Sequence, residues 1–244
     1  MTLDPVSIWN IISVYNVSLM PKLYRNTIYN TGVFSLIVQI FTGLIGFYVL
    51  FWVSVPASLD IIRQLLWMEC VVQIVEFVFY VWMVSQFQTI ENITPFRYWD
   101  WAITTPTMLT SFMIYLYYLS REQDSAVEDV NSILWKHYGV VVPVLLLNWL
   151  MLFFGYLGEL RFLSMNLATG LGFIPFFTFF YWIWKYFAQQ STLGMVVFGY
   201  FLIVWGLYGV ASLLNYKAKN ICYNILDLFS KNFFGLYFAW ILLK

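Results

Sequence analysis

An acid and an amine lie four residues apart in the last apolar run of the chain, at Asp227 and Lys231. Residues at i and i+4 share one face of a helix, so the two side chains are neighbours. A lysine withdrawn from water loses its proton readily, and a neutral amine condenses with an aldehyde to form a Schiff base. The pair therefore indicates a Schiff-base lysine with a carboxylate beside it.

Further ionisable residues interrupt earlier apolar runs. Arg97, Asp100 and Thr104 follow the spacing i, i+3, i+7 in the third run and share a face, and Glu76 lies in the second run. If the third and seventh runs touch, Asp100 and Asp227 together supply the counterion in a nearly neutral buried cluster with Arg97 and Lys231. The alternative is a structural ion-pair network that locks the helices together, because buried pairs also occur for packing alone.

The composition indicates an integral membrane protein. Of the 244 residues, 62% are hydrophobic and only 10% are charged, which is less charge than soluble domains carry. The formal net charge is zero, so nothing favours nucleic acid as a partner. His137, Cys70 and Cys222 are too few and too scattered for a metal site, and no hydrolytic Ser/His/Asp set gathers around the single histidine.

Seven apolar segments are long enough to cross a bilayer, and this count predicts an all-α bundle of seven transmembrane helices. The segment 6–20 is too short to span and is broken by polar residues, so we expect residues 1–28 to be an N-terminal interfacial segment of a single domain, 1–244. The basic residues of the connections do not favour either orientation. The predicted spans are 31–53, 62–84, 95–119, 134–157, 162–187, 193–214 and 220–243.

Three short motifs resemble those of microbial (type 1) rhodopsins. RYWDWAITTP (97–106), WGLYG (205–209) and DLFSK (227–231) are similar to the motifs of the third, sixth and seventh helices of that family. The resemblance extends over the whole chain. It implies that Lys231 binds all-trans retinal as a protonated Schiff base. It also implies that Asp100 is the primary counterion and proton acceptor, that Asp227 is the second counterion, and that Arg97 lies on the release side.

The resemblance also implies a chromophore pocket. Trp101, Trp205 and Tyr208 would wall the chromophore, and Thr104 would form a hydrogen bond near Asp100. Since 22% of the residues are aromatic, any one ring alone would indicate only ordinary packing. Met108 falls where the family tunes colour, and an apolar side chain there goes with green absorption. By position, the pocket comprises Trp101, Thr105, Met108, Trp205, Tyr208 and Ser212.

The sequence departs from the efficient proton pumps of that family. Eleven residues after the acceptor, where those pumps often carry a carboxylate, stands Ser111, so the motif is Asp100, Thr104, Ser111. A serine is not a titrating donor near neutral pH, so we expect the Schiff base to regain its proton slowly or directly from water. Lys219 stands where haloarchaeal pumps have an acidic release residue.

The sixth helix departs from the family as well. Gly209 replaces the usual proline, and Ser212 replaces a usual tryptophan. These two changes predict a different kink in the helix and a different ring end of the pocket.

The Asp-Thr-Ser set is similar to that of small rhodopsins carried by giant viruses of marine algae and protists. One branch of them has a second-helix Gln-x-x-Glu and asparagines on the seventh helix. The matching polar residues would form a candidate ion path, or the amides would simply hold helices together in lipid. These residues are Ser35, Gln73, Glu76, Asn220, Asn224 and Asn232.

Taken together, these features predict a retinal-binding protein that translocates protons outward in the light, with no enzymatic activity. A light-gated cation channel is the first alternative, so the transported ion is a proton or a monovalent cation. A sensory photoreceptor is the second. The resemblance implies an N-terminus outside a host cell membrane, and homo-oligomerisation is left open. A retinal-free transporter is disfavoured, because no repeats with broken helices are evident.

Overall fold

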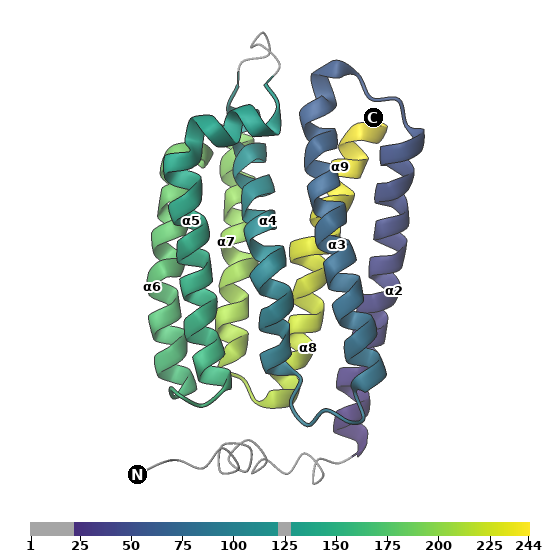
Figure 1. The fold of residues 1–244 in the computed structure, drawn as a ribbon, viewed down its shortest axis with the longest axis vertical. Coiled ribbons are helices and arrows are strands. Elements are labelled where there is room, and N and C mark those ends of the chain that lie inside the picture. Colours follow the sequence, from purple (N-terminus) through teal and green to yellow (C-terminus); the bar gives the residue numbers. More distant parts are fainter. Residues whose placement is uncertain (1–21, 122–127) are drawn as a thin grey trace.

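The computed structural model describes residues 22–121 and 128–244, and its regular structure in these ranges consists of helices (Figure 1). In chain order they are α2 (Lys22–Trp52), η2 (Ala57–Leu59), α3 (Asp60–Gln86), α4 (Thr94–Ser120), α5 (Val130–Glu159), α6 (Met165–Ile183), η3 (Trp184–Ala188), α7 (Thr192–Ser212), α8 (Tyr216–Asp227), η4 (Leu228–Asn232) and α9 (Phe233–Leu243).

The long helices form a closed bundle around a common interior. Each long helix packs against the next one in the chain, and α2 also packs against α8 and α9, which closes the ring. The elements α8, η4 and α9 follow one another without a break and together make the seventh span. The predicted bundle of seven transmembrane helices is therefore confirmed.

The first helix begins earlier than the sequence predicts. Helix α2 starts at Lys22 rather than at residue 31, so the expected boundary at residue 28 falls inside it. Ile28 is buried in a small cluster with Tyr80 and Met83, and its carbonyl oxygen accepts a hydrogen bond from Asn224. These contacts give the early turns of α2 a place in the bundle. The segment 6–20, expected to be interfacial, lies outside the described residues.

Six of the seven spans are long and apolar enough to cross a membrane, and α4 is the exception. Its sequence carries Arg97, Asp100 and several threonines. This polarity is tolerated because α4 is the enclosed helix, with 15 of its 27 side chains buried against five of 30 in α5. The chain is an integral, multi-pass membrane protein.

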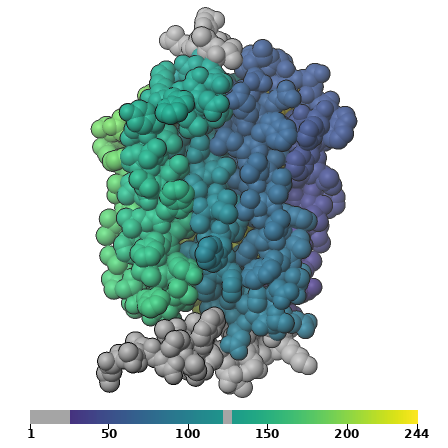
Figure 2. Space-filling model, in the orientation of Figure 1, coloured from purple at the N-terminus to yellow at the C-terminus, as the bar shows by residue number. Residues whose placement is uncertain are grey.

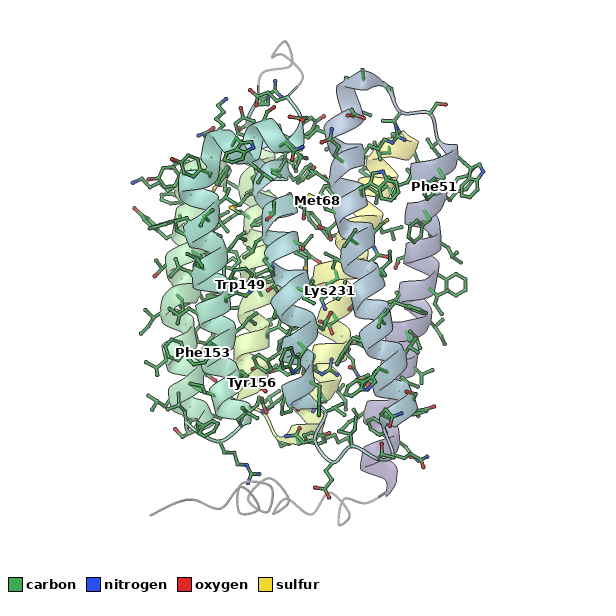
Figure 3. The ribbon with its side chains drawn as sticks, viewed as in Figure 1. Phe51, Met68, Trp149, Phe153, Tyr156 and Lys231 are labelled. Carbon is green, nitrogen blue, oxygen red and sulfur yellow. The ribbon has the colours of Figure 1, made fainter. Side chains whose placement is uncertain are left out.

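The outer surface is apolar and the interior is partly charged, the reverse of a soluble domain. Phe51, Trp149 and Phe153 point outward and are about half exposed, whereas Lys231 at the centre is 1% exposed (Figure 3). On one long face, the side chains of α5 and α3 flank those of α4 (Figure 2). An apolar exterior suits lipid, so the buried polar groups need a separate explanation.

Side-chain caps fix where four of the helices begin. Asp129, Ser164, Ser191 and Asn215 each accept a hydrogen bond from the backbone amide three residues on, at 2.9–3.4 Å, and start α5, α6, α7 and α8. Hydrogen bonds from the Ser132 hydroxyl and amide also lower the pKa of Asp129. The caps set the register in which the following helices present their inward faces.

Candidate functional site

The centre of the bundle holds one amine among three carboxylates. The Nζ atom of Lys231 lies 2.6 Å from Oδ2 of Asp100, 3.5 Å from Oδ1 of Asp227 and 3.7 Å from Oε1 of Glu76. The acids come from α4, α8 and α3, and all four side chains are buried. The third and seventh spans do touch, and the structure adds a third acid that the sequence had placed only on a candidate ion path.

A π-helical segment shapes the backbone at the lysine. Lys231 lies in η4, where Ser230, Lys231 and Asn232 are all buried. Three consecutive inward side chains do not fit the single inward stripe of a regular α-helix. Single π-helical turns inside α-helices are frequent at functional sites. Here the wider turn lets the amine and its neighbouring amide both face the interior.

The two aspartates have different surroundings. Asp227 accepts hydrogen bonds of 2.8 Å from the hydroxyls of Tyr80 and Tyr208, and Nη1 of Arg97 lies 3.5 Å away. Asp100 bonds to Lys231 through one oxygen, and its other oxygen is buried without a hydrogen-bond partner among the described residues. Three donors stabilise Asp227 as an anion. Asp100 is therefore the acid with spare capacity to accept a proton from the lysine.

Thr104 does not bond to the Asp100 carboxylate. Its hydroxyl donates to the backbone carbonyl of Asp100 at 3.0 Å. The contact lies near the acid, but it holds the helix rather than the carboxylate.

Arg97 is fully buried in a polar and aromatic shell. Its Nε donates to Oδ1 of Asn220 at 3.1 Å, and its Nη2 donates to Oδ1 of Asn224. Its guanidinium carbon lies 5.8 Å from the ring centres of Tyr80 and Tyr223. The two asparagines, predicted for an ion path, thus hold the arginine in place. We call Arg97, Asn220, Asn224, Tyr80 and Tyr223 together the arginine cluster.

Ser35 also belongs to this side of the site. Its hydroxyl donates to the backbone carbonyl of Asn224 at 2.8 Å and so ties α2 to the seventh span.

The remaining predicted path residues form a second group, which we call the amide cluster. Asn232 donates to Oε2 of Glu76 at 3.0 Å, and its own oxygen lies 2.9 Å from the hydroxyl of Thr42. That hydroxyl is also 3.3 Å from Oε1 of Gln73. The amide cluster connects α2, α3 and the seventh span through Glu76, beside the lysine.

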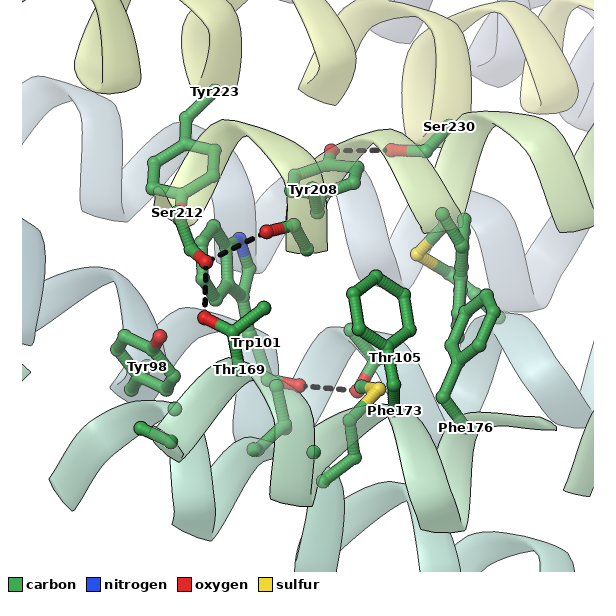
Figure 4. A pocket seen from close by; sticks show the side chains of 18 of the residues that line it. Tyr98, Trp101, Thr105, Thr169, Phe173, Phe176, Tyr208, Ser212, Tyr223 and Ser230 are labelled. Carbon is green, nitrogen blue, oxygen red and sulfur yellow. Dashed lines mark hydrogen bonds between the residues drawn. The ribbon is translucent and has the colours of Figure 1, made fainter. Parts of the chain in front are cut away.

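A cavity lies beside the lysine. Seven of its 19 lining residues are aromatic, and the close-up in Figure 4 shows Tyr208 bonded to Ser230 and Ser212 bonded to Thr169. Lys231 itself lines the cavity. An apolar cavity with one buried amine suits an apolar aldehyde that condenses with that amine. All the predicted pocket residues line it, namely Trp101, Thr105, Met108, Trp205, Tyr208 and Ser212.

Contacts around Gly209 and Ser212 show how the sixth span accommodates these two residues. Helix α7 runs through Gly209 to Ser212 without interruption. The ring of Phe173 packs onto Gly209 so closely that a Cβ atom there would lie 2.5 Å from Cζ of Phe173. Ser212 donates to the Gly209 carbonyl at 2.7 Å. An aromatic ring from α6 therefore occupies the space beside Gly209 in this part of the pocket.

Two residues that contact the site, Glu69 and Tyr80, are not predicted from the sequence. Glu69 is fully buried on α3, and Ser111, the predicted replacement for a proton donor, donates a hydrogen bond to it. The spacing could have predicted Glu69, because Glu69, Gln73 and Glu76 follow i, i+4, i+7 and share one face of the second span. Tyr80 was missed because a tyrosine in an aromatic-rich span is unremarkable by itself.

Lys219, in the place of a release acid, also has an acidic partner. Its Nζ lies 2.8 Å from Oε1 of Glu159 at the end of α5.

A family model described as bacteriorhodopsin-like protein matches residues 30–244. No protein among the curated sequences matches the chain.

Solved structures resemble it over most of its length. Viral rhodopsin OLPVRII is 28% identical, with a TM-score of 0.74 over 88% of this chain and 97% of that one. A blue light-absorbing proteorhodopsin from Med12 is 21% identical, with a TM-score of 0.67 over 89% and 97%. The light-driven proton pump of Coccomyxa subellipsoidea is 18% identical, with a TM-score of 0.66 over 87% and 96%. At these last two identities the likeness concerns the fold.

Proposed function

The chain belongs to the bacteriorhodopsin-like protein family, which confirms the resemblance of its motifs, and on this premise we propose that it binds all-trans retinal at Lys231 and translocates protons outward in the light. The observation that carries the proposal is the 2.6 Å contact between Nζ of Lys231 and Oδ2 of Asp100, beside a cavity that Lys231 lines together with seven aromatic residues. When bound, retinal supplies the light-driven isomerisation that reorients the bond at the lysine nitrogen.

The chain's own residues then control the proton. Asp100 takes it from the lysine nitrogen, since its second oxygen has no competing donor among the described residues. Asp227, held by two phenols and Arg97, keeps its negative charge and stabilises positive charge at Lys231. The aromatic walls keep bulk water from the nitrogen, so the proton passes to the acid in contact with it.

Direction follows from the position of the arginine cluster. It lies at the end of the bundle where α8 begins, and the C-terminus lies at the opposite end (Figure 1). With the N-terminus outside a host cell membrane, Arg97 lies between Asp100 and the outer surface. A proton released from Asp100 leaves through this half.

A light-gated cation channel is the second candidate. It is favoured by polar side chains on both sides of Lys231, the amide cluster on one side and the arginine cluster on the other. Conduction would require Arg97 to leave its two asparagines, because a fixed guanidinium repels cations.

Cells that express the protein and receive retinal test the two candidates. Acidification of the medium in light that a protonophore abolishes supports outward pumping. Photocurrents that reverse sign with membrane voltage support the channel. Lys231→Met is the control, and a visible absorption band that survives this substitution contradicts both.

A further inference from the structure

We propose that the cavity holds a subsite for a hydroxyl group, formed by Tyr98, Thr169 and Ser212, and that the aldehyde this chain prefers is a retinal hydroxylated on its ring. This inference rests on the proposed function and deepens it. It concerns the end of the cavity away from Lys231, where the ligand carries no reactive group.

Three hydroxyls gather at that end. Tyr98, Thr169 and Ser212 all line the cavity, as Lys231 does. In the close-up they lie on the side opposite Ser230, which directly precedes Lys231 (Figure 4). Thr169 comes from α6, which packs against α5 and α7 and lies across the bundle from α9 (Figure 1). A molecule that is attached to Lys231 and fills the cavity therefore brings its other end to these hydroxyls.

The packing of α5 on α6 brings Tyr98 and Thr169 to the same level. A Cβ atom on Gly158 would lie 2.7 Å from Cβ of Ala168, the neighbour of Thr169. Gly155 lies one turn before Gly158 on α5, and a Cβ atom there would lie 2.6 Å from the hydroxyl oxygen of Tyr98. The absence of a side chain at Gly155 thus makes room for the phenol at this end of the cavity.

The hydroxyls of Ser212 and Thr169 leave an acceptor free. Ser212 donates to the carbonyl oxygen of Gly209 at 2.7 Å, so the 2.7 Å contact between the two hydroxyls is donated by Thr169. A hydroxyl has one proton and two lone pairs. The oxygen of Thr169 accepts no hydrogen bond from the described residues and can accept one from a ligand.

The hydroxyl of Tyr98 is a free donor. The side chain is only 9% exposed, yet its hydroxyl forms no hydrogen bond with any residue that the structure describes. The rings of Trp101 and Tyr156 hold the phenol in place, with centroids 5.0 and 5.6 Å from its own. Buried phenols usually have a hydrogen-bond partner, so this one indicates a ligand atom in the cavity.

One hydroxyl group on the ligand satisfies both residues. It would accept a hydrogen bond from Tyr98 and donate one to Thr169, whereas a plain hydrocarbon ring leaves both unpaired, which weakens binding. Among the described residues that line the cavity, Lys231 alone is charged, so the distal group is neutral rather than anionic.

Competition between aldehydes tests the subsite. Membranes from cells that express the chain without retinal receive equal amounts of all-trans retinal and all-trans 3-hydroxyretinal. Hydroxylamine then releases the bound aldehydes for chromatography. We expect the hydroxylated form to be enriched about 10-fold in the bound fraction, the scale of two net hydrogen bonds. A parallel experiment with 4-hydroxyretinal covers the adjacent ring carbon, and the proposal is overturned if neither hydroxylated aldehyde is enriched.

Two variants remove the hydroxyls and keep the shapes of the side chains. Tyr98→Phe and Thr169→Val should each reduce the enrichment, and the double variant should abolish it while plain retinal still gives a visible band. Thr107→Val is the matched control on α4, because its hydroxyl donates to the carbonyl oxygen of Ile103 and Thr107 does not line the cavity. Enrichment that survives in the double variant overturns the assignment to these residues.

Thermal stability gives a second readout. With plain retinal bound, Tyr98→Phe should lose its visible band at the same temperature as the wild type, because the hydroxyl it removes has no partner. A clear fall in that temperature means that the protein already satisfies this hydroxyl and contradicts the subsite. A wild-type protein without a visible band for any of the aldehydes contradicts the proposed function itself, whereas equal uptake of all of them contradicts only the subsite.

Discussion

The hydroxyl of Tyr80 donates a 2.8 Å hydrogen bond to Oδ2 of Asp227, and both side chains are fully buried. The same hydroxyl lies 3.4 Å from Nη1 of Arg97, so the phenol joins the anion to the cation. These contacts join the seventh span to α3 at Asp227. Tyr80 carries no charge of its own, so the spacing of charged residues in the sequence does not predict this contact.

Tyr80→Phe should lower the free energy of unfolding by about 1.5–3 kcal/mol, the scale of a buried hydrogen bond to a charged group. Denaturant unfolding in lipid–detergent micelles measures the change. Tyr117→Phe is the matched control, because its hydroxyl bonds to Glu128 in a connecting segment and its loss should cost under about 1 kcal/mol. Equal losses in the two variants would mean that the Tyr80 contact has no special role.

Asp100→Asn should shift the visible band to longer wavelength and reduce light-driven acidification by about 100-fold or more. In the proposed function, the carboxylate in contact with the lysine nitrogen stabilises positive charge there in the dark and accepts its proton in the light, and an amide would do neither. Absorption spectra and medium pH record both effects. Asp129→Asn is the control outside the bundle, since asparagine also caps helices well. Full acidification by Asp100→Asn would refute the acceptor role.

Gly209→Ala should reduce the extent of retinal binding and shift the absorption band. The new methyl would lie 2.5 Å from Cζ of Phe173, so this ring must move, and it lines the pocket. Gly206→Ala is the control on the same helix, because its nearest neighbour would be Cζ of Phe176 at an ordinary 3.8 Å. Titration with retinal measures the bound fraction. If both alanine variants bind like the wild type, Phe173 does not limit the pocket.

The span count and the partners of Lys231 could be predicted because they depend on long apolar runs and on charges that are rare within them. Asp100 and Asp227 are conspicuous in such runs, and both lie within 3.5 Å of the lysine nitrogen. The start of α2 was missed because the polar residues before residue 31 look like a connection, although Asn224 draws Ile28 into the bundle. Hydropathy does not register such tertiary contacts.

The local backbone geometry and the partners of individual polar side chains could not be predicted from the sequence. The π-helical turn of η4 buries four of its five residues, and no glycine or proline between Leu228 and Asn232 marks it in the sequence. By sequence, Asn220 and Asn224 match a candidate ion path, whereas in the structure both bind the guanidinium of Arg97. Spacing predicts which residues share a face, whereas the partner across the interface depends on how the helices are rotated.

The buried ion pair between Lys219 and Glu159 should contribute strongly to the stability of the protein. The two side chains are only 9% and 6% exposed and their atoms lie 2.8 Å apart. Removing one partner leaves a buried charge unpaired, so Glu159→Gln should lower the free energy of unfolding by about 3–5 kcal/mol. The double variant Lys219→Met with Glu159→Leu should recover most of that loss, because two apolar groups leave no charge unpaired.

The pair of Lys136 and Glu128 provides the comparison for this cycle. It is exposed at 54% and 29% with a separation of 3.4 Å, so Glu128→Gln should change stability by less than about 1 kcal/mol. Unfolding midpoints at low and high salt separate the two cases, since screening weakens an exposed pair and leaves a buried one nearly unaffected. If Glu159→Gln is as mild as Glu128→Gln, Lys219 is solvated in the membrane-bound protein and the end of α5 is open to water.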